Sequence, residues 1–563
     1  MTMIDGGALV GKALANEGIE KAFVLCGGHI MPIFYGMRNA GIEIIDMRHE
    51  CAAVYAAIAY TRASGKMAVV VTTAGPGVGN TPAGMMEAQS LGIPLLQIGG
   101  AVAMTMRDAG DLQDMSTLKV METCSKWARK ITHTERIPEY VSMAFRYARD
   151  SSPGPVYLEI PTDLLFAKIE EEKAAFPVNY RTDAIPYGDP ALIDRAAELL
   201  AGAKRPVAVV GDGAFFSMGD KAWAVEALSD HLKMPVGVSG PSCRGLLGDE
   251  YENPLLATLL GAIAIDAVDV ILSLGCRFDF RLGLGRTIPK DAKVIQVHTD
   301  MWQIGFNLRA DIGIVGGAGP VASSLLEAIQ SKRKKPADAS WIGKDVKTGR
   351  WLLPAAYMAE GTPIHPGRCA GEVARFLEEN ARDWTIVCDG GEAGVWMGIA
   401  AKAQRPGQIH FSGANGTIGT GPALAIGAWA ANRKPVIWYT GDGSFGFYAM
   451  EMDTMAKQGI PVICVISNDS AWGMIRLVEK YIRPEEVESK GHCNVELHHM
   501  RAYEKMAAMW DGYGECVTDP LEIIPAIKRA AANGKPSIIN VEVDKISLSP
   551  FIAGYANMVK PSA

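Results

Sequence analysis

Two short polar motifs near the C-terminus carry residue types suited to phosphate and metal chemistry. Gly441-Asp442-Gly443 follows one apolar run, and Asn468-Asp469 follows the next, with 24 residues between them. Glycines let a ligand approach the backbone closely, and the side-chain oxygens are hard donors of the kind that Mg²⁺ takes beside phosphates. Together the motifs indicate a divalent cation that clamps a diphosphate between two strand ends. Each motif alone is equally typical of a turn after a buried strand.

Such a site requires neighbouring parallel strands that end at the same edge of a sheet, and the chain has the pattern that builds them. Short, almost continuously apolar runs alternate with helical patterns along most of its 563 residues. This alternation predicts βαβ units with helices on both faces of the sheet, where ligands bind beyond the carboxyl ends of the strands. We expect an α/β fold of three doubly wound parallel-sheet domains at residues 1–180, 191–335 and 360–548, followed by a tail at 549–563 that covers the active site.

The composition excludes several classes of protein. The net charge is -7, and the only dense run of Lys and Arg is at 331–336, so nucleic acid is not an expected partner. No apolar run reaches the roughly 18 residues that a membrane-spanning helix needs. The ten cysteines are scattered without a Cys-x-x-Cys pair, which is typical of reduced, buried thiols. We therefore expect a cytoplasmic enzyme without a membrane partner.

Motifs across the whole chain resemble one enzyme superfamily. The GDG and ND motifs, a Glu at position 50, the GPG turn at 75–77 and the segments FSGANGTIGTG and GCRFDFR are together similar to thiamine diphosphate-dependent enzymes. The resemblance is to the acetolactate synthase and benzaldehyde lyase-like branch, of which 2-hydroxyacyl-CoA lyase and oxalyl-CoA decarboxylase are related members. The chain departs from the family at Asp469, where a second Asn is usual.

The resemblance implies roles for individual residues. Glu50 would hydrogen-bond the aminopyrimidine ring of thiamine diphosphate and promote deprotonation of the thiazolium carbon, although a Glu at a helix start is also favoured by the helix dipole. Ile418 would force the cofactor into a bent conformation. Mg²⁺ would be bound by Asp442, Asp469 and the carbonyl of Ala471. Further contacts with the cofactor are implied for Thr73, Gly75, Asn80, Gly390, Gly391, Gly416, Gly441, Gly443, Ser444 and Asn468.

His29 and Gln113 bear on the reaction itself. They resemble a His and a Gln that lie near the reacting carbon in benzaldehyde lyase. The segment SNDSAWGM, which contains Trp472, also resembles the corresponding segment of that enzyme. A His there would shuttle a proton on the substrate hydroxyl, because imidazole titrates near neutrality. The alternative is an ordinary loop histidine. We expect a carbon–carbon lyase or carboligase acting on 2-hydroxy carbonyl compounds; the alternatives are a 2-hydroxyacyl-CoA lyase, a 2-oxo acid decarboxylase or an acetolactate synthase-type enzyme.

Two other classes of function are less favoured. A nucleotide-binding scaffold would not need Glu50, and a nicotinamide dehydrogenase would need a full Gly-x-Gly-x-x-Gly after a strand. The resemblance also implies a small-molecule carbonyl substrate and a homodimer or homotetramer in which Glu50 and the diphosphate site come from different subunits. Side-chain preference would depend on Trp396, Met397, Ile418 and Trp472.

Two basic or metal-like clusters have alternative interpretations. In the middle domain, Arg277, Arg281, Arg286 and Lys290 would hold FAD or an ADP/CoA group, or form a solvated face. The segment GHCNVELHHM at 491–500 contains three histidines, one cysteine and one glutamate. We expect an active-site cover or a polar surface there rather than a metal site.

Overall fold

The computed structural model describes residues 2–247, 252–253, 268–286, 288–332, 354–547 and 549. Their contacts divide the chain into two compact units. The first comprises the described residues of 1–183, 415–436 and 446–462, and the second comprises those of 184–414, 437–445 and 463–563. The predicted tail, apart from Ser549, lies outside the described residues.

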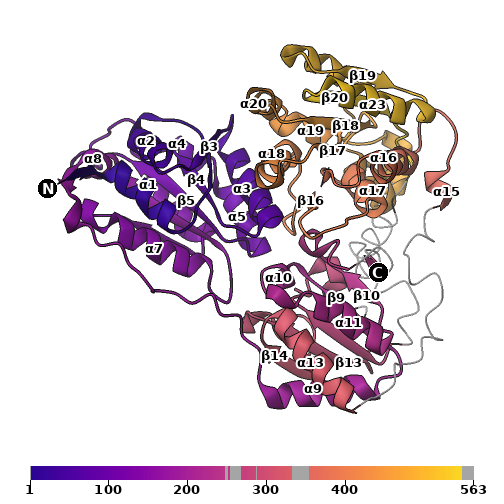
Figure 1. Cartoon of the computed structure of the whole chain (residues 1–563). Helices are drawn as coiled ribbons and strands as arrows, with labels where there is room; N and C mark the ends of the chain where they lie inside the picture. The colour runs from indigo at the N-terminus through magenta and orange to yellow at the C-terminus, as the bar shows by residue number, and fades with distance from the viewer. Residues whose placement is uncertain are drawn as a thin grey trace. The chain divides into compact units, whose positions relative to one another are not determined.

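The first unit contains a six-stranded parallel sheet with the order β3-β2-β4-β5-β7-β6 (Figure 1). Its strands are β2 (Lys21–Val24), β3 (Glu43–Asp46), β4 (Ala68–Thr72), β5 (Leu95–Ala101), β6 (Trp127–Lys130) and β7 (Pro155–Pro161). Its helices from the N-terminal part of the chain are α1 (Gly6–Asn16), α2 (Met31–Asn39), α3 (Glu50–Ser64), α4 (Pro76–Gly79), α5 (Pro82–Leu91), α6 (Thr117–Cys124), α7 (Ile137–Ala148) and α8 (Thr162–Phe166). Strands β1 (Met3–Asp5) and β8 (Lys168–Glu170) form a separate antiparallel pair. Three of the four inner strands, β4, β5 and β7, are wholly buried, as expected when helices cover both faces.

Two segments from the C-terminal part of the chain complete this unit. They contain α18 (Gly421–Asn432) and α20 (Glu451–Gln458), and α18 lies beside α3 (Figure 1). The two helices approach closely at Gly427, where an added Cβ would lie only 1.9 Å from the backbone oxygen of Ala56. Any larger residue at position 427 would therefore push α18 away from the helix that begins at Glu50.

The second unit contains two further parallel sheets. One has the order β11-β10-β9-β12-β13-β14, and the other has the order β16-β15-β17-β18-β20-β19. The first is formed by β9 (Pro206–Val210), β10 (Val236–Val238), β11 (Glu252–Asn253), β12 (Val270–Leu274), β13 (Lys293–His298) and β14 (Ile312–Val315). The second is formed by β15 (Thr385–Cys388), β16 (Ile409–Phe411), β17 (Val436–Gly441), β18 (Val462–Asn468), β19 (Gly514–Val517) and β20 (Ser537–Glu542). The longer helices of this unit are α9 (Pro190–Gly202), α11 (Trp223–Leu232), α13 (Ala318–Lys332), α16 (Pro366–Asn380), α17 (Glu392–Ala400), α21 (Gly473–Ile482) and α23 (Ile523–Asn533).

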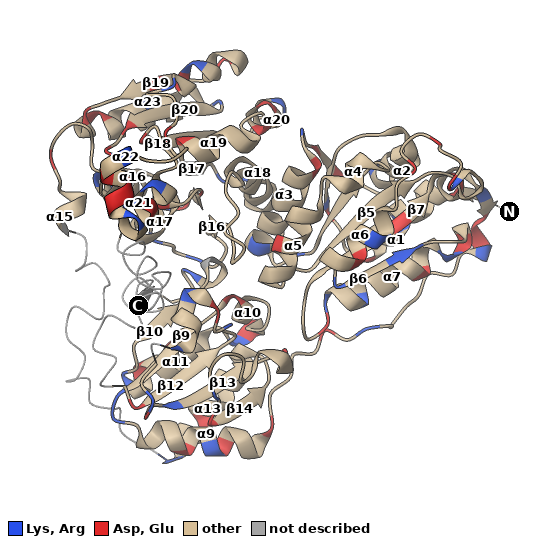
Figure 2. Cartoon of the chain, turned by 180° about the vertical axis from the view of Figure 1, so that it is seen from behind, with Lys and Arg blue, Asp and Glu red and all other residues tan. Residues whose placement is uncertain are grey.

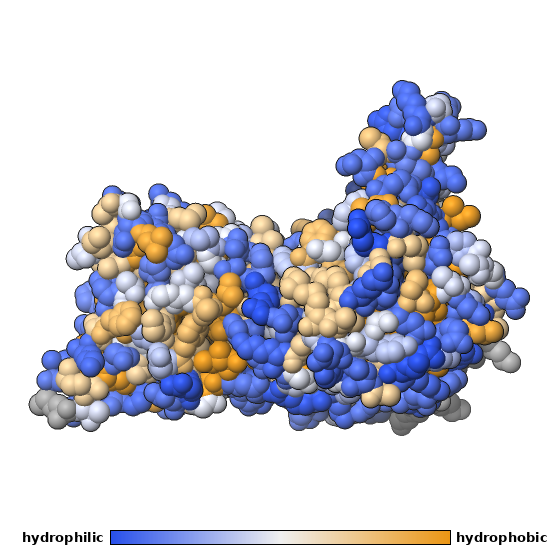
Figure 3. Space-filling view, turned by 90° about the horizontal axis from the view of Figure 1, so that it is seen from above, coloured by the Kyte–Doolittle hydropathy of each residue, from blue (hydrophilic) through white to orange (hydrophobic). Residues whose placement is uncertain are grey.

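Three parallel α/β sheets confirm the predicted fold class. Basic and acidic residues are interspersed along the helices (Figure 2), and the face seen in Figure 3 mixes hydrophilic and hydrophobic residues. In the part of the chain that the structure describes, no helix combines the length and the apolar character needed to cross a bilayer. None of the ten cysteines, all of which the structure describes, forms a disulfide bond, and seven of them are buried.

Candidate active site

Glu50 is the first residue of α3, in the first unit, and its carboxylate is held by a side-chain amide. Asn80 Nδ2 donates a hydrogen bond of 2.9 Å to Glu50 Oε2. Only 7% of the Glu50 surface is exposed. Asn80 follows the GPG turn after β4, so the turn and the start of α3 meet at the carboxyl end of the sheet. A neutral donor orients this carboxylate without cancelling its charge.

His29 and Gln113 lie beside the same turn. His29 Nδ1 is 3.5 Å from Thr73 Oγ1, and an added Cβ at Gly75 would lie 2.8 Å from the Cβ of Gln113. Gly75 also has φ +58°, which a residue with a side chain rarely adopts, so both its backbone and its neighbour require glycine. The structure therefore gathers the predicted residues of this half, His29, Glu50, Thr73, Gly75, Asn80 and Gln113, around one turn.

A buried glutamine that the sequence analysis did not select supports this turn. Gln97 lies in β5 with no exposed surface, and its Nε2 donates to Thr81 Oγ1 at 2.9 Å and to Thr72 Oγ1 at 3.3 Å. These two threonines flank the turn that carries Thr73 and Asn80. The signal was a single amide inside the otherwise apolar strand PLLQIGG, since a buried polar side chain requires partners.

Gly416 and Ile418 belong to the first unit by their contacts, in the loop that precedes α18. The neighbouring Thr417 Oγ1 donates to Glu87 Oε2 of α5 at 3.2 Å. This hydrogen bond ties the loop to the N-terminal part of the chain. Apart from Gly416, Ile418 and the residues around the Glu50 turn, the predicted cofactor and metal residues belong to the second unit.

In the second unit, Asp442 and Asp469 lie together after the neighbouring strands β17 and β18. Their carboxyl groups are hydrogen-bonded to each other. Burial and then the adjacent Asp469 raise the pKa of Asp442 well above its usual range, and burial also raises the pKa of Asp469. Two buried carboxyl groups that share one site are the donor set a hard divalent cation would stabilise.

Glycine-rich backbone surrounds this acidic pair. An added Cβ at Gly390 would lie 2.7 Å from Ser444 Oγ, so the loop after β15 touches the start of the helix that follows Gly441. Asp469 Oδ1 accepts a hydrogen bond from Ala471 N at 3.2 Å. The predicted residues of this half lie at or just after the carboxyl ends of β15, β17 and β18; they are Gly390, Gly391, Gly441, Asp442, Gly443, Ser444, Asp469 and Ala471.

Asn468 is directed to other partners. Its Nδ2 donates to Asn540 Oδ1 at 2.9 Å, and its Oδ1 accepts from Ser470 N at 3.0 Å. Its side chain therefore holds the loop to the neighbouring strand β20.

Glu392 is a further acidic residue near the glycines that the sequence analysis did not select. It begins α17 directly after Gly390 and Gly391, and its Oε2 accepts a hydrogen bond of 2.9 Å from Ser549 Oγ. Burial raises its pKa to about 7. Its position in the sequence could have identified it, since a charged residue that follows two glycines at a strand end lies close to where ligands of parallel sheets bind.

In the other clusters singled out in the sequence, Arg281 and His492 have partners of their own among the described residues. Arg281 donates to Asp212 Oδ2 at 3.0 Å and to Asp279 Oδ2 at 2.8 Å. His492 Nδ1 lies 2.8 Å from Glu479 Oε2, and among the described residues no group of three or more His, Cys, Asp or Glu is placed to hold a metal ion.

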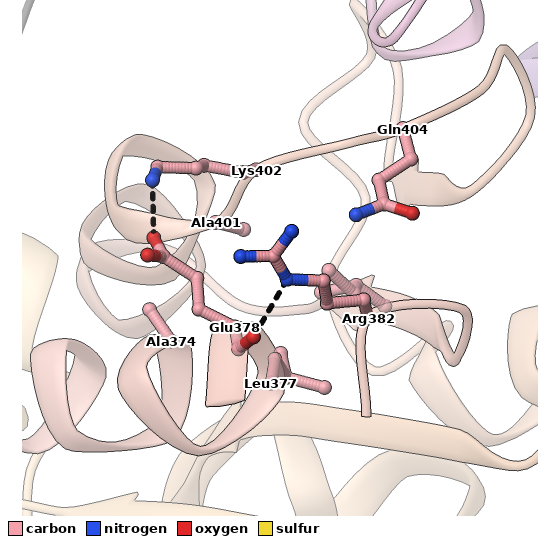
Figure 4. A pocket seen from close by; sticks show the side chains of 8 residues that line it. Ala374, Leu377, Glu378, Arg382, Ala401, Lys402 and Gln404 are labelled. Atoms are coloured by element: carbon pink, nitrogen blue, oxygen red, sulfur yellow. Dashed lines mark hydrogen bonds and ion pairs between the residues drawn. The ribbon is translucent and has the colours of Figure 1, made fainter. Parts of the chain in front are cut away.

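A small pocket of the second unit lies away from the candidate site (Figure 4). It is lined by the end of α16, the start of β15 and residues 401–404, and Lys402 in it forms a 2.7 Å ion pair with Glu378. The start of β15 is at the opposite edge of the sheet from Gly390. This pocket is therefore not part of the acidic site.

Comparison with known proteins identifies what this arrangement belongs to. Three family descriptions match in order: thiamine pyrophosphate enzyme, N-terminal TPP binding domain, at residues 4–121; the central domain at 193–325; and the C-terminal TPP binding domain at 389–541. The chain belongs to the thiamine pyrophosphate enzyme family. This confirms the predicted superfamily, and the two TPP binding domains contain the Glu50 turn and the Asp442 site respectively.

Relatives in this family match almost the whole chain. The chain is 29% identical to a probable acetolactate synthase large subunit of Methanocaldococcus jannaschii, over 99% of this chain and 95% of that protein. It is 30% identical to 2-hydroxyacyl-CoA lyase 2 of Danio rerio, over 96% of this chain and 92% of that protein. The residues present fit thiamine pyrophosphate, which is thiamine diphosphate. A hydrogen-bonded carboxylate lies in one TPP binding domain, and a buried acidic pair among glycines lies in the other.

Proposed function

We propose that this protein is a thiamine diphosphate- and Mg²⁺-dependent carbon–carbon lyase and carboligase acting on 2-hydroxy carbonyl compounds. The observation that carries the proposal is the placement of His29 beside the Glu50 turn, 3.5 Å from Thr73 Oγ1. An imidazole there supplies an acid–base group in addition to Glu50. Cleavage of a 2-hydroxy carbonyl compound needs such a group, because the substrate hydroxyl must lose its proton as the bond breaks.

Each candidate residue of the N-terminal TPP binding domain has a distinct role in this proposal. When bound, thiamine diphosphate supplies a nucleophilic carbon and takes up the electrons of the cleaved bond. Glu50 holds a proton at the aminopyrimidine ring, and Asn80 keeps its carboxylate oriented. His29 moves a proton at the substrate hydroxyl. Gln113, held against Gly75, orients the substrate by hydrogen bonding.

The C-terminal TPP binding domain would bind the diphosphate end of the cofactor. Asp442, Asp469 and the carbonyl of Ala471 would hold Mg²⁺, and the amides around Gly441 and Gly443 would face the diphosphate. The raised pKa of Asp442 supports this assignment, because burial and the adjacent Asp469 both disfavour its charged form, and a bound cation would favour it. Glu392 would contribute hydrogen bonding beside the same loop.

The middle sheet has no assigned ligand in this proposal. Arg281 is already engaged by Asp212 and Asp279, and Asp212 directly follows Gly211 at the end of β9. A carboxylate at that strand end repels a phosphate, so these residues do not fit FAD or an ADP group held through Arg281.

We also propose a homodimer, or a tetramer of two dimers, with Glu50 and the acidic pair from different subunits at each active site. Exposed apolar side chains of the loop that carries Gln113 support this, since their burial would stabilise an interface; they are Met104, Met106, Leu112 and Met115. A fully active monomer in sedimentation would contradict it.

A second candidate is an acetolactate synthase-type reaction on 2-oxo acids, favoured by the relatives of that name. A substrate panel separates the two. The purified enzyme with thiamine diphosphate and Mg²⁺ is given an acyloin, a 2-hydroxyacyl-CoA or pyruvate, and aldehyde and carbon dioxide are measured. We expect aldehyde release from one of the first two substrates to dominate; dominant carbon dioxide release from pyruvate would overturn the lyase proposal.

A further inference from the structure

A buried glutamate from the C-terminal part of the chain accepts hydrogen bonds from the backbone just before Glu50. Glu451, the first residue of α20, has no exposed surface. Its Oε1 accepts hydrogen bonds of 3.0 Å from both Arg48 N and His49 N. These contacts join positions that are 403 and 402 residues apart in the chain. The anchored peptide groups immediately precede the residue whose carboxylate Asn80 holds.

The carboxylate of Glu451 has little other use. Its second oxygen, Oε2, accepts a 2.8 Å hydrogen bond from Thr454 Oγ1 within the same helix. Burial raises its pKa to about 7, with the hydrogen bonds from Thr454, Arg48 N and His49 N opposing the rise. A charged group buried in this way costs free energy unless it is fully hydrogen-bonded. Its other hydrogen bonds come from the two backbone amides before Glu50, and the charge of Arg48 also favours the ionised form. These interactions offset part of the cost of burial.

Other contacts fix the same stretch from its remaining sides. His49 Nδ1 accepts from Cys51 N at 3.1 Å and so caps α3, and the His49 ring packs edge-on against Tyr448 with centroids 5.2 Å apart. The Arg48 side chain forms an exposed ion pair with Asp453. Of these groups, only Glu451 binds the backbone amides of both residues that precede Glu50.

We propose that Glu451 is a positioning residue for Glu50. It does not touch the cofactor; it fixes the backbone from which α3 and the Glu50 side chain begin, while Asn80 fixes the carboxylate at the other end. This inference rests on the proposed function, in which Glu50 serves the cofactor. Misplacing a catalytic group by about 1 Å costs on the order of 10²-fold in rate, so a remote anchor can matter.

The first test examines the anchor without any cofactor. Backbone amide hydrogen–deuterium exchange is measured in the apo protein for a peptide covering residues 48–51. Glu451→Leu keeps the volume and removes the acceptors, and we expect exchange at this peptide to accelerate by about tenfold or more. Asp453→Asn is the matched control on the same helix, because it loses only the exposed ion pair. Unchanged exchange in Glu451→Leu, or equal acceleration in the control, would overturn the anchor.

The second test asks whether the anchor acts through Glu50. Exchange of the cofactor's C2 proton for deuterium is measured in the holoenzyme. We expect Glu451→Leu to slow it by about 10- to 100-fold, and Glu451→Gln, which keeps an oxygen for both amides, to restore most of it. In a Glu50→Gln background, Glu451→Leu should cause no further loss. A full, multiplicative loss there, or no rescue by Gln, would overturn the positioning role.

The two tests also separate this inference from the proposed function. If the wild-type chain supported no C2 exchange at all, the proposed function would fail together with the positioning role, whereas the amide exchange of the apo protein would still report on the anchor. Normal C2 exchange in the wild type with no effect of Glu451→Leu would overturn the inference alone.

Discussion

The buried acidic residues of the two TPP binding domains have different hydrogen-bond partners. Glu50 receives a hydrogen bond from Asn80, and its helix start is anchored through backbone amides. The carboxyl groups of Asp442 and Asp469 are hydrogen-bonded to each other, and the pKa values of both are raised. The first carboxylate is oriented by a neutral amide of the chain, whereas the second site consists of two buried carboxyl groups, in which the charge of Asp469 disfavours ionisation of Asp442. The proposed function therefore assigns proton transfer to the carboxylate that the chain already orients, and metal binding to the pair that a cation would stabilise.

The largest effect is expected when the acidic pair is broken. Asp442→Ala removes one of the two carboxylates, so the diphosphate would lie near Asp469 without its neutralising Mg²⁺. We expect Mg²⁺-dependent binding of thiamine diphosphate to be abolished in equilibrium dialysis. Removing Mg²⁺ from the wild-type protein with a chelator should have the same effect.

A matched control is Asp453→Ala, which removes an exposed aspartate of α20. It should bind the cofactor as the wild type does. Unchanged affinity in Asp442→Ala would show that the pair is a structural feature rather than a metal site.

The next largest effect is expected from a change at Glu50. Glu50→Gln keeps an oxygen and a similar volume but cannot take a proton as a carboxylate does. We expect slow exchange of the C2 proton and the loss of every reaction of the enzyme, with cofactor binding retained, because the diphosphate is held by the other domain. Normal C2 exchange in this variant would remove Glu50 from cofactor activation.

His29→Ala should act later in the reaction. We expect C2 exchange to stay near the wild-type rate, while cleavage of the 2-hydroxy substrate falls by about 10²- to 10⁴-fold, as is typical for one general acid–base group. The contrast with Glu50→Gln is measured on the same samples. An equal loss of C2 exchange in both variants would assign His29 to cofactor activation or to the fold, and the lyase proposal would lose its carrying residue.

The sequence was sufficient for whatever depends on local pattern. Continuous apolar runs predicted the parallel sheets, and polar residues at two strand ends predicted that Asp442 and Asp469 lie together. The residues near Glu50 came from the family resemblance. Contacts between distant segments were not predictable in this way. Glu451 shows no periodic signal that points to Arg48, and nothing in the run ALAIGAWAA says that α18 packs on α3 at Gly427.

Side-chain direction was the other gap. Asn468 and Asp469 are adjacent and both carry oxygen donors, so the sequence alone assigned both to the ligand. In the structure Asn468 is bonded to Asn540 and Ser470, while Asp469 meets Asp442. The choice is made by Asn540 on the neighbouring strand β20, 72 residues away, which offers the Asn468 amide a partner.

The smallest effect is expected from Asp469→Asn, which sharpens the contrast between the two sites. The change installs the residue that is usual in the family. An Asn keeps an oxygen that can accept from Ala471 N, as Asp469 Oδ1 does at 3.2 Å, and it removes the like charge that faces Asp442. If Mg²⁺ needs an oxygen donor at this position rather than a second negative charge, cofactor binding at saturating Mg²⁺ should change by no more than about threefold. Asp469→Ala, which removes the donor, should weaken binding much further. Equilibrium dialysis of the two variants side by side decides the point: equally poor binding by both would mean that the charge of Asp469 itself is required, and that this chain holds its metal differently from relatives with Asn.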